Sequence, residues 1–355
     1  MAALGRRCSR VLPLPGGCST GPRGRRSGAT AVSLAAPLVR LGRGRAPGSP
    51  EQRRVLGAQV HAACRDVGFF QVTGHGVEPE LRAAVLASAA RFFELGAGAK
   101  DAVSIRRSRS WRGYQRVGEN ITQEAPDWHE ALDLYSESAQ AANSAHEGAN
   151  QWPREVPTLR PAVERYVAEM RQLGADLMRL IALGLQLPED HFDRDFDDSF
   201  WCLRAIRYPP SGGERTAQAL GVGEHTDYGC LTLLMADDQL EGGVGALQVR
   251  DRRGEWVHLE AEPGAIMCNI GDMLARWTNG IYRSTPHRVL RPRTERIAVP
   301  FFFEPNYSAV VEPIPYCCRL SGLPSCYPPV KYGDHLLSKT SANFAPAPPG
   351  PAPAA

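Results

Sequence analysis

The sequence predicts an α+β fold with a mainly β core, in which two sheets form a double-stranded β-helix, or jelly roll, flanked by helices. After Phe200, short apolar segments alternate with turn residues at intervals of about ten residues, which is typical of a double-sheet jelly roll. Before them, from about Leu159 to Leu185, apolar residues recur at three- and four-residue steps. This periodicity predicts a long backing helix near 159–185 that covers a sheet.

The composition is that of a globular protein and excludes two classes of partner. The chain has 355 residues, of which 43% are hydrophobic, so a large core can form. The net charge is +3, and the basic residues are mixed with acids rather than striped along one face, which gives no nucleic-acid signature. No apolar run approaches the roughly 20 residues that span a bilayer. We therefore expect no nucleic-acid partner and no membrane span.

The nine cysteines are scattered and contain no Cys-x-x-Cys pair. This usage favours reduced thiols and suits an intracellular protein. The adjacent Cys317 and Cys318 are interpreted as incidental neighbours rather than as a redox or metal site.

The two ends of the chain differ from the rest in composition. Residues 1–29 form an Arg-rich extension, and residues 1–50 contain nine arginines and no acidic residue. This bias is typical of an organelle-targeting segment and also fits a disordered extension. We expect a cytoplasmic protein, with mitochondrial or plastid import as the alternative. The Pro/Ala-rich tail at 345–355 cannot build a core and is expected to be disordered.

Residues 30–156 are expected to form an N-terminal region of helices, short strands and a long loop. The patterns predict strands at 31–39 and 68–74 and helices at about 51–66 and 78–94. Residues 101–156 are richer in charge, Gly and Asn, and we predict a loop region with short elements there. His129, which precedes Glu130, is interpreted as a structural histidine because no second ligand lies nearby.

Residues 157–344 are expected to combine the long helix with the jelly-roll core, which occupies about 200–305. The methionines of the helix are interpreted as core filler. Strands are predicted at 201–208, 225–234, 245–250, 255–259, 264–270, 283–290 and 296–303.

The triplet His225-Thr226-Asp227 and the distant His287 form a candidate metal site. Side chains alternate along a strand, so His225 and Asp227 would point the same way, and a jelly roll can bring His287 beside them. Two imidazoles and one carboxylate on one face of a metal leave the opposite face open, as in non-haem Fe(II) oxygenases. By itself, the His-x-Asp pattern also fits a zinc site or an ordinary surface pair.

A second candidate feature is Arg296, which opens the otherwise apolar strand 296–303. A buried guanidinium is costly unless it is paired with an anion. The position of Arg296 therefore indicates an anionic ligand or partner.

Five stretches together resemble the 2-oxoglutarate and Fe(II)-dependent dioxygenases, specifically the branch similar to isopenicillin N synthase. The matching stretches are 223–234 around the triplet, 269–280, 282–289 around His287, 68–77 and 113–120. The resemblance extends over roughly Ala31 to Phe344.

The resemblance implies roles for individual residues. It implies that His225, Asp227 and His287 bind Fe(II). It also implies that Arg296 forms a bidentate salt bridge with the distal carboxylate of 2-oxoglutarate and that Tyr208 helps to hold this cosubstrate. The substrate is expected to contact Tyr228, Phe302 and Glu304.

Two positions depart from the family's pattern. Where family members usually carry a serine two positions after the arginine, this chain has Ala298. The missing hydrogen bond to a charged group is worth roughly 1.5–3 kcal/mol, or about ten- to a hundredfold in affinity. Where many members carry an asparagine that supports the other end of 2-oxoglutarate, this chain has Ile206.

The sequence therefore favours a monomeric Fe(II)- and 2-oxoglutarate-dependent dioxygenase, an oxidoreductase that uses O2 and hydroxylates or otherwise oxidises a small organic molecule with release of succinate and CO2. Ascorbate would keep the iron reduced. An isopenicillin N synthase-like oxidase that does not use 2-oxoglutarate is the alternative, favoured by Ala298. A non-catalytic jelly-roll binding protein is the third hypothesis.

Overall fold

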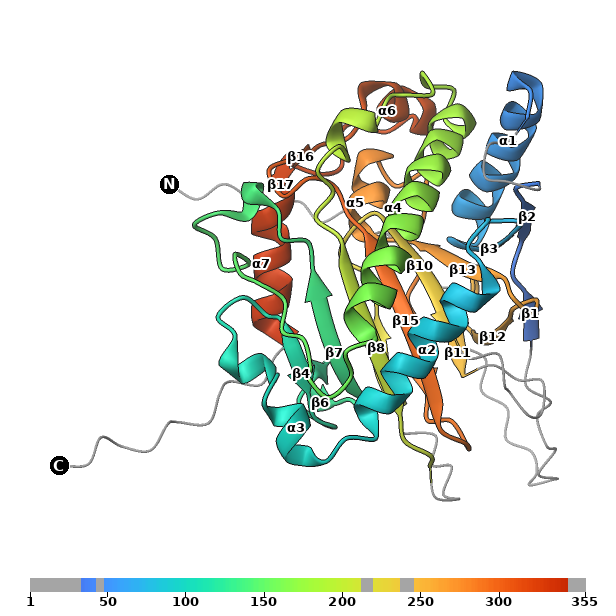
Figure 1. Cartoon of the computed structure of the whole chain (residues 1–355). Helices are drawn as coiled ribbons and strands as arrows, with labels where there is room; N and C mark the ends of the chain where they lie inside the picture. The colour runs from blue at the N-terminus through green and yellow to red at the C-terminus, as the bar shows by residue number, and fades with distance from the viewer. Residues whose placement is uncertain (1–32, 43–47, 212–219, 237–245, 344–355) are drawn as a thin grey trace, which may run out of the picture. The chain divides into compact units, whose positions relative to one another are not determined.

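Two sheets form the core, as Figure 1 shows for the computed structural model of this protein. The major sheet contains, in spatial order, β2 (Leu38–Arg40), β3 (Phe69–Thr73), β13 (Ile266–Ile270), β10 (Leu231–Ala236), β15 (Arg296–Phe303), β8 (Cys202–Tyr208), β7 (Glu130–Tyr135) and β4 (Gly113–Gln115). The minor sheet contains β1 (Ser33–Ala35), β12 (Trp256–Glu260), β11 (Leu247–Arg250), β14 (His287–Leu290) and β9 (Leu220–His225).

From β8 to β15 the chain passes repeatedly between the two sheets, and every pairing among these eight strands is antiparallel. This exchange is the topology of a jelly roll, which confirms the predicted core. Two additional strand pairs lie outside the sheets: β5 (Ile121–Thr122) with β6 (Ala125–Pro126), and β16 (Val310–Val311) with β17 (Val330–Lys331).

The structure describes residues 33–42, 48–211, 220–236 and 246–343, which all belong to one unit, Val32–Ala355. The Arg-rich extension at 1–29 and the tail at 345–355 lie outside the described residues. No helix in the described part is long and apolar enough to cross a membrane.

Helices cover the outer face of the major sheet (Figure 1). The described α-helices are α1 (Pro50–Asp66), α2 (Pro79–Phe93), α3 (Ala97–Asp101), α4 (Leu159–Gly184), α5 (Asp272–Trp277), α6 (Pro315–Ser321) and α7 (Tyr332–Asn343). Short 3-10 turns occupy η1 (Ile105–Arg107), η2 (Ala139–Ala141) and η3 (Asp193–Asp195).

Helix α1 begins where its sequence supplies a complete cap. The hydroxyl of Ser49 accepts a hydrogen bond from the backbone N–H of Gln52, and the Gln52 side chain accepts one from the backbone N–H of Ser49. Pro50 occupies the first helical position, where its missing N–H costs nothing. Gly57 then allows α1 to approach α4, because a Cβ at this position would lie 3.0 Å from the carbonyl oxygen of Leu180.

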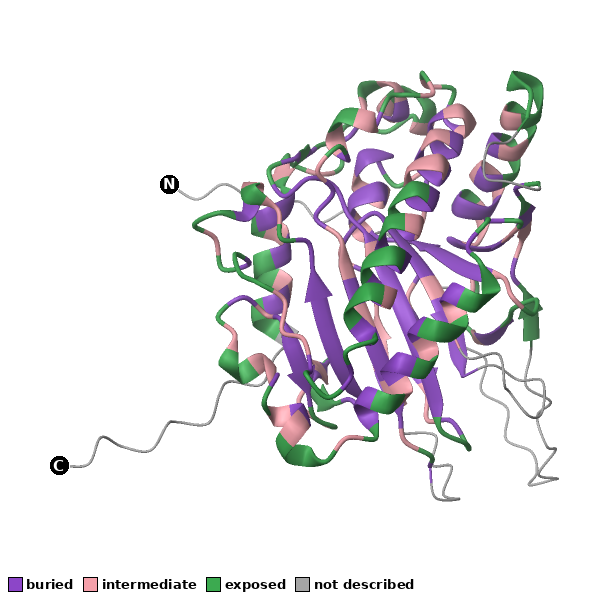
Figure 2. Ribbon diagram, viewed as in Figure 1, coloured by how far each residue is buried: buried purple, intermediate pink, exposed green. Residues whose placement is uncertain are grey.

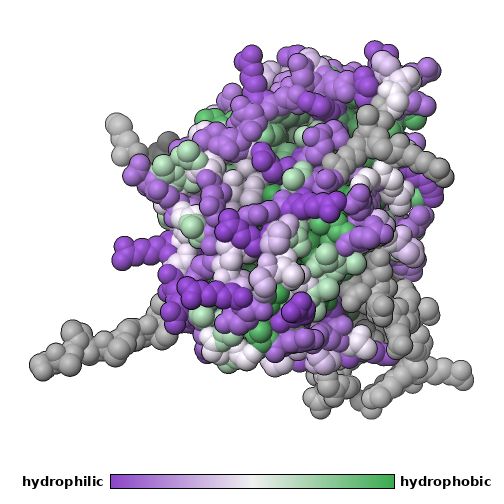
Figure 3. Space-filling view, viewed as in Figure 1, coloured by the Kyte–Doolittle hydropathy of each residue, from purple (hydrophilic) through white to green (hydrophobic). Residues whose placement is uncertain are grey.

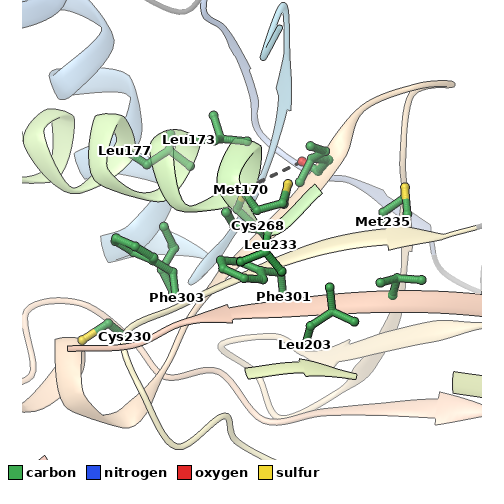
Figure 4. Close-up of a cluster of buried hydrophobic side chains, with 14 of the residues drawn as sticks. Met170, Leu173, Leu177, Leu203, Cys230, Leu233, Met235, Cys268, Phe301 and Phe303 are labelled. Atoms are coloured by element: carbon green, nitrogen blue, oxygen red, sulfur yellow. Dashed lines mark hydrogen bonds between the residues drawn. The ribbon is translucent and has the colours of Figure 1, made fainter. Parts of the chain in front are cut away.

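Helix α4 packs its apolar stripe against strands β10 and β15. Met170, Leu173 and Leu177 lie over Leu233, Phe301 and Phe303 in Figure 4, and all six are buried. Gly174 lets the helix settle directly on the Phe303 ring, since a Cβ there would lie 2.5 Å from it. Each such buried side chain contributes about 1.5–3 kcal/mol through the hydrophobic effect.

Burial differs between the major sheet and the helices that pack against it. The strands of the major sheet are almost entirely buried, whereas the helices expose one side (Figure 2). The surface seen in the same view is largely hydrophilic, with apolar side chains visible only between polar ones (Figure 3).

The region at 101–156 contains short elements, as expected, but the strand in its centre was not predicted individually. Strand β7 lies there, all six of its residues are buried, and it pairs with β8 in the major sheet. Its sequence, Glu-Ala-Leu-Asp-Leu-Tyr, hides the strand because two acidic residues interrupt the apolar pattern. Both acids are paired: Glu130 with Lys100 and Arg207, and Asp133 with Arg204.

The segment predicted as one strand at 31–39 is divided. β1 joins the minor sheet and β2 joins the major sheet, with Pro37 between them. Proline has no N–H to donate to a sheet, so it marks the point where the chain leaves one sheet for the other.

Candidate metal centre

His225, Asp227 and His287 lie close together, the two histidines on neighbouring strands of the minor sheet. β9 pairs with β14 so that His225 and His287 are opposite each other, and their ring centres are 4.2 Å apart. The Nε2 atoms of both histidines lie 3.7 Å from Oδ1 of Asp227. Among the described residues, these are the only three His, Cys, Asp or Glu side chains whose ligand atoms all lie within 4.8 Å of one another.

The route by which Asp227 reaches this group differs from the predicted one. The expected strand at 225–234 is two strands, because β9 ends at His225 and β10 begins at Leu231. Asp227 lies in the turn between them, so strand alternation does not explain why it faces His225. The turn is fixed instead by backbone hydrogen bonds from Asp272 N–H to Asp227 O (2.8 Å) and from Met273 N–H to Gly229 O (2.8 Å).

Both imidazoles are held with Nε2 directed toward Asp227. Nδ1 of His225 lies 2.9 Å from the carbonyl oxygen of Gly223, and Nδ1 of His287 lies 3.1 Å from that of Thr285. A carbonyl oxygen only accepts, so Nδ1 carries the proton in both rings and the lone pair of Nε2 is left for a metal.

The carboxylate of Asp227 is fixed through its other oxygen. Oδ2 accepts hydrogen bonds from the hydroxyl of Thr232 and from Nδ2 of Asn269, the latter at 2.5 Å. Thr232 and Asn269 are paired neighbours on β10 and β13. The sequence analysis missed both residues as supports, although each lies within a stretch that it quoted.

The electrostatic states of Asp227 and His287 suit binding of a divalent cation. Burial opposes the charge of Asp227, but His287, His225 and the two hydrogen bonds outweigh it, and the pKa of Asp227 is lowered. Burial, together with His225, lowers the pKa of His287 to about 4. Neutral imidazoles and an ionised carboxylate are the protonation states in which these groups bind a metal, and this ligand set with open positions fits Fe(II).

Arg296 and Tyr208 are neighbours across strands β15 and β8. They are paired in register, and the guanidinium carbon lies 5.5 Å from the centre of the tyrosine ring. Both side chains are buried, and burial raises the pKa of Tyr208 to about 12, so it is a neutral hydroxyl at physiological pH. The pair can therefore offer one permanent charge and one hydroxyl to an anion.

The two departures from the family pattern face each other. Ala298 pairs with Ile206 across β15 and β8, and both belong to the same apolar cluster as Tyr208. Because side chains alternate along a strand, these two lie on the same face as Arg296 and Tyr208. A patch of apolar surface thus adjoins the Arg296–Tyr208 pair.

A pocket of about 110 Å³ lies beside the metal ligands. Five predicted site residues line it: His225, Asp227, Tyr228, Phe302 and Glu304. His287, Arg296 and Tyr208 are not among its lining residues. The sequence analysis missed several others, among them Asn120, Thr122, Tyr135, Arg204, Tyr332, Leu336 and Thr340.

Glu304 is a buried acidic residue in the lining of this pocket. Its Oε2 accepts a hydrogen bond from the backbone N–H of Cys230 at 3.0 Å. Gly229 makes the approach possible, because a Cβ at that position would lie 1.2 Å from Oε2 of Glu304. The pKa of Glu304 is raised to about 8, chiefly by burial and also by Asp227 and Asp272, while the Cys230 N–H and the Tyr332 hydroxyl oppose the rise.

His129 and the described cysteines, the remaining candidates from the sequence, lie outside the metal-binding group. His129 is buried, and its Nδ1 lies 2.9 Å from the carbonyl oxygen of Gly221 in β9, outside the metal-binding group. The described cysteines, including Cys317 and Cys318, are all free thiols, as expected.

Two family models match the chain. Residues 36–155 match the N-terminal model of non-haem dioxygenases in morphine synthesis, and residues 200–305 match the 2OG-Fe(II) oxygenase superfamily. The chain is 42% identical over 291 residues to a homoarginine-6-hydroxylase of Oryza sativa subsp. japonica, which covers 79% of this chain and 87% of the relative. It is 40% identical over 297 residues to a homoarginine-6-hydroxylase of Glycine max, covering 81% and 88%.

The chain is also similar in structure to solved proteins. A full-length Neurospora crassa protein in complex with alpha-KG superposes with a TM-score of 0.74 at 26% identity, covering 86% of this chain and 96% of that one. JOX2 in complex with 2OG, Fe and JA superposes with a TM-score of 0.71 at 29% identity, covering 90% and 92%.

Proposed function

Because this chain belongs to the 2OG-Fe(II) oxygenase superfamily, we propose that His225, Asp227 and His287 hold its Fe(II) and that Arg296 and Tyr208 hold 2-oxoglutarate. The chain is a 2-oxoglutarate-dependent dioxygenase, which was the leading hypothesis from the sequence. The proposal concerns which residues do the work and on what substrate.

The reaction consumes one molecule each of O2, 2-oxoglutarate and substrate. Bound Fe(II) supplies the redox chemistry that couples the oxidative decarboxylation of 2-oxoglutarate to the oxidation of a substrate C–H bond. One oxygen atom enters succinate and the other enters the hydroxylated product, with CO2 released.

The chain's own residues position the reactants. Arg296 binds the distal carboxylate of 2-oxoglutarate, because a planar guanidinium matches a carboxylate in a two-bond geometry. Asp227 keeps one oxygen directed at the metal because Thr232 and Asn269 hold the other. The buried, apolar surroundings of Ile206 and Ala298 keep water away from the cosubstrate.

We propose that the substrate is a small amino acid with a guanidinium group. The observation that carries this proposal is Glu304, a buried carboxyl group in the wall of the pocket. A carboxylate has about four lone-pair positions, and the Cys230 N–H and Tyr332 hydroxyl occupy two of these on Glu304. The others can accept the paired N–H groups of a guanidinium. The rice and soybean relatives are named for such a substrate, homoarginine.

Phe302 and Tyr228 have a different role in this proposal. Phe302 lies two residues before Glu304 in the chain, and both aromatic residues line the pocket. They would pack against the methylene groups that precede the guanidinium, which excludes water from the ion pair and strengthens it.

The proposal is tested by substrate-stimulated succinate release with Fe(II), 2-oxoglutarate and ascorbate. L-homoarginine and L-arginine are compared with L-homocitrulline and L-citrulline, whose neutral urea groups have nearly the same shape. We expect stimulation by at least one guanidino compound, with kcat/KM about tenfold or more above its urea analogue, since a charged hydrogen bond contributes roughly 1.5–3 kcal/mol.

Glu304→Gln should remove most of that preference, and the exposed Glu312→Gln should keep it. His225→Ala, which removes one of the proposed metal ligands, measures how much succinate is released without an intact metal site. Equal rates with the guanidino and urea compounds in the wild-type protein would refute recognition by Glu304, and no stimulation by any of the four would refute the substrate class.

A further inference from the structure

Arg204, which lines the pocket, is paired with the buried Asp133 behind it. Arg204 on β8 donates from Nε to Oδ1 of Asp133 at 2.6 Å and from Nη2 to Oδ2 at 2.7 Å. Asp133 lies opposite Arg204 on β7 and has no exposed surface. Gln115 on β4 donates a further hydrogen bond to Oδ2 of Asp133 at 2.5 Å. Three strands of the major sheet therefore fix the orientation of this guanidinium.

The arrangement leaves part of the guanidinium for a ligand. A guanidinium has five N–H groups, and the side-on pair with Asp133 uses one on Nε and one on Nη2. Nη1 makes no hydrogen bond to any residue in the described part of the chain, while Arg204 lines the pocket with 18% of its side chain exposed. The edge formed by Nη1 and Nη2 can bind a second carboxylate through two parallel hydrogen bonds.

The position of Arg204 separates it from the proposed cosubstrate pair. Tyr208 lies four residues further along the same strand, which corresponds to about 13 Å at 3.3 Å per residue. Ile206 lies between them and pairs with Ala298. A carboxylate bound by Arg204 is therefore distinct from the distal carboxylate that Arg296 would bind.

Arg204 and Glu304 both line the pocket and lie well apart along the sheet. Cys202 pairs with Phe302 across β8 and β15, and Arg204 and Glu304 follow these two residues in antiparallel directions. Their backbones are thus about four residues, or about 13 Å, apart along the sheet, and both side chains line the same pocket. A ligand that reaches both needs an anionic group and a cationic group joined by a long chain.

The charges of wall and ligand also balance. Arg204 with Asp133 is neutral as a pair, and Glu304 adds one negative charge once a bound cation favours its ionised form. An amino acid with a guanidinium carries one carboxylate, one ammonium and one guanidinium, so its net charge is positive. Complementary net charge favours entry of such a molecule over a simple carboxylic acid.

We infer that Arg204, oriented by Asp133 and Gln115, binds the α-carboxylate of the substrate, so that the pocket recognises both ends of a long cationic amino acid. This inference rests on the proposed function, which assigns the cationic end to Glu304. Arg204 is then a specificity-determining residue, and Asp133 and Gln115 are positioning residues that act through it.

The test compares an amino acid with the same molecule lacking its carboxylate. Dissociation constants of L-homoarginine and of the corresponding ω-guanidino amine are measured anaerobically for the Fe(II)–2-oxoglutarate protein, from the change in its visible absorption band. In the wild-type protein we expect the amino acid to bind about ten- to a hundredfold more tightly than the amine, because the amine cannot form the charged pair of hydrogen bonds with Arg204.

Two variants test the residue and a third serves as the control. Arg204→Lys keeps the charge but loses the fork geometry, and Arg204→Gln with Asp133→Asn removes both charges, so that no buried carboxylate is left unpaired. Both should reduce the preference for the amino acid to less than about threefold. In turnover, KM for the amino acid should rise while kcat changes little, as expected for binding energy shared by ground and transition states. Arg207→Lys, on the same strand and paired with Glu130 instead, should keep the wild-type preference.

The outcomes separate this inference from the proposed function. The same measurement is made with 2-aminoheptanoate and hexylamine, which have no cationic side chain. If only these neutral-chain compounds bind and their preference depends on Arg204, the assignment of Arg204 to the α-carboxylate stands, while the guanidinium proposal and the recognition of a cationic end by Glu304 fail. If the preference survives in both Arg204 variants, or if the variants weaken 2-oxoglutarate binding instead, the inference is wrong. Failure of every compound to bind overturns both.

Discussion

Single residues around Asp227 decide how the metal ligands are presented. Thr232 and Asn269 hold Oδ2, and neither residue belongs to the group of three metal-binding side chains. Thr232→Val should therefore weaken Fe(II) affinity about 10- to 100-fold, the usual cost of losing an outer partner of a metal ligand, without unfolding the protein.

Metal titration of the purified variant, followed by competition with a chromophoric chelator, would measure this. Thr278→Val is the matched control, because its hydroxyl bonds to the carbonyl oxygen of Leu274 and not to the site. Equal affinities of the Thr232 variant and the wild-type protein would show that Asn269 alone is sufficient to orient Asp227.

Glu304 gives the metal-free protein a pH-dependent stability. Its pKa is about 8 in the folded protein, against 4.5 as the ordinary value, so the folded state keeps a proton that the unfolded state loses. The contribution to stability is fully present below about pH 4.5 and is lost as the pH rises toward 8, by up to about 1.4 kcal/mol per pH unit. The groups around the carboxyl are Asp227 and Asp272, which raise the pKa, and the Cys230 N–H and Tyr332 hydroxyl, which lower it.

Urea unfolding between pH 5.5 and 7.5 would test this contribution. The slope of unfolding free energy against pH should be less negative in Glu304→Gln than in the wild-type protein, and unchanged in Glu312→Gln. Parallel slopes in all three proteins would contradict the raised pKa. A bound cation would favour the ionised form, so binding of a guanidino substrate should release a proton and become tighter as the pH rises toward 8.

At the scale of elements, the last described helix completes the pocket. Tyr332, Leu336 and Thr340 of α7 recur at four-residue steps and line it, and the hydroxyl of Thr340 lies 3.3 Å from Nε2 of the buried His146. Leu336→Trp should fill the pocket and raise the KM for the substrate at least tenfold, while succinate release without substrate persists.

Leu337→Trp is the control, because Leu337 is 37% exposed on the neighbouring position of the same helix. Steady-state kinetics and uncoupled succinate formation distinguish a blocked pocket from a damaged metal site. Loss of uncoupled turnover in Leu336→Trp would mean that α7 supports the metal ligands and not only the substrate.

The elements also show what sequence patterns can and cannot reveal. The strands after Phe200 and the segment at 159–185 have a regular apolar period, and the structure has strands and helix α4 in those places. Strand β7 was not predicted because Glu130 and Asp133 interrupt its apolar pattern. The partners of these two acids, Lys100, Arg207 and Arg204, come from other parts of the chain. No local pattern contains such long-range pairing.

The same limit applies to the site. The grouping of His225, Asp227 and His287 was expected from residue type together with the family resemblance, because metal chelation needs few, specific side chains. The proposed role of Arg204 could not be predicted in this way, since its orientation depends on Asp133 and Gln115 from two other strands. Likewise, α7 joins the pocket through tertiary packing, and its short amphipathic sequence alone does not indicate what it covers.

At the scale of the whole molecule, the metal group connects the two sheets. His225 and His287 belong to β9 and β14 of the minor sheet, while Asp227 is held by Thr232 and Asn269 of the major sheet. A metal ion bound to all three therefore stabilises the closed jelly roll, because the unfolded chain has no such site.

Thermal unfolding with and without a redox-inert divalent ion such as Mn(II) would measure this connection. At a metal concentration of 100 times Kd, binding stabilises the folded state by about 2.7 kcal/mol, which corresponds to a rise in Tm of about 4 °C for a chain of this size. Removal of the metal with a chelator should reverse the rise, and His225→Ala should show none. A full shift in that variant would place the ion elsewhere in the molecule.

The pairing of Ile206 with Ala298 bears on selective inhibition. If Arg296 and Tyr208 hold 2-oxoglutarate as proposed, an analogue with a methyl branch would bring that branch against these two apolar side chains, and each Å² removed from water gains about 25 cal/mol. In family members with serine and asparagine at these positions, the same branch would deprive a hydroxyl and an amide of their hydrogen bonds. A compound of this kind would discriminate between enzymes that share one cosubstrate, through two side chains that touch no reacting atom.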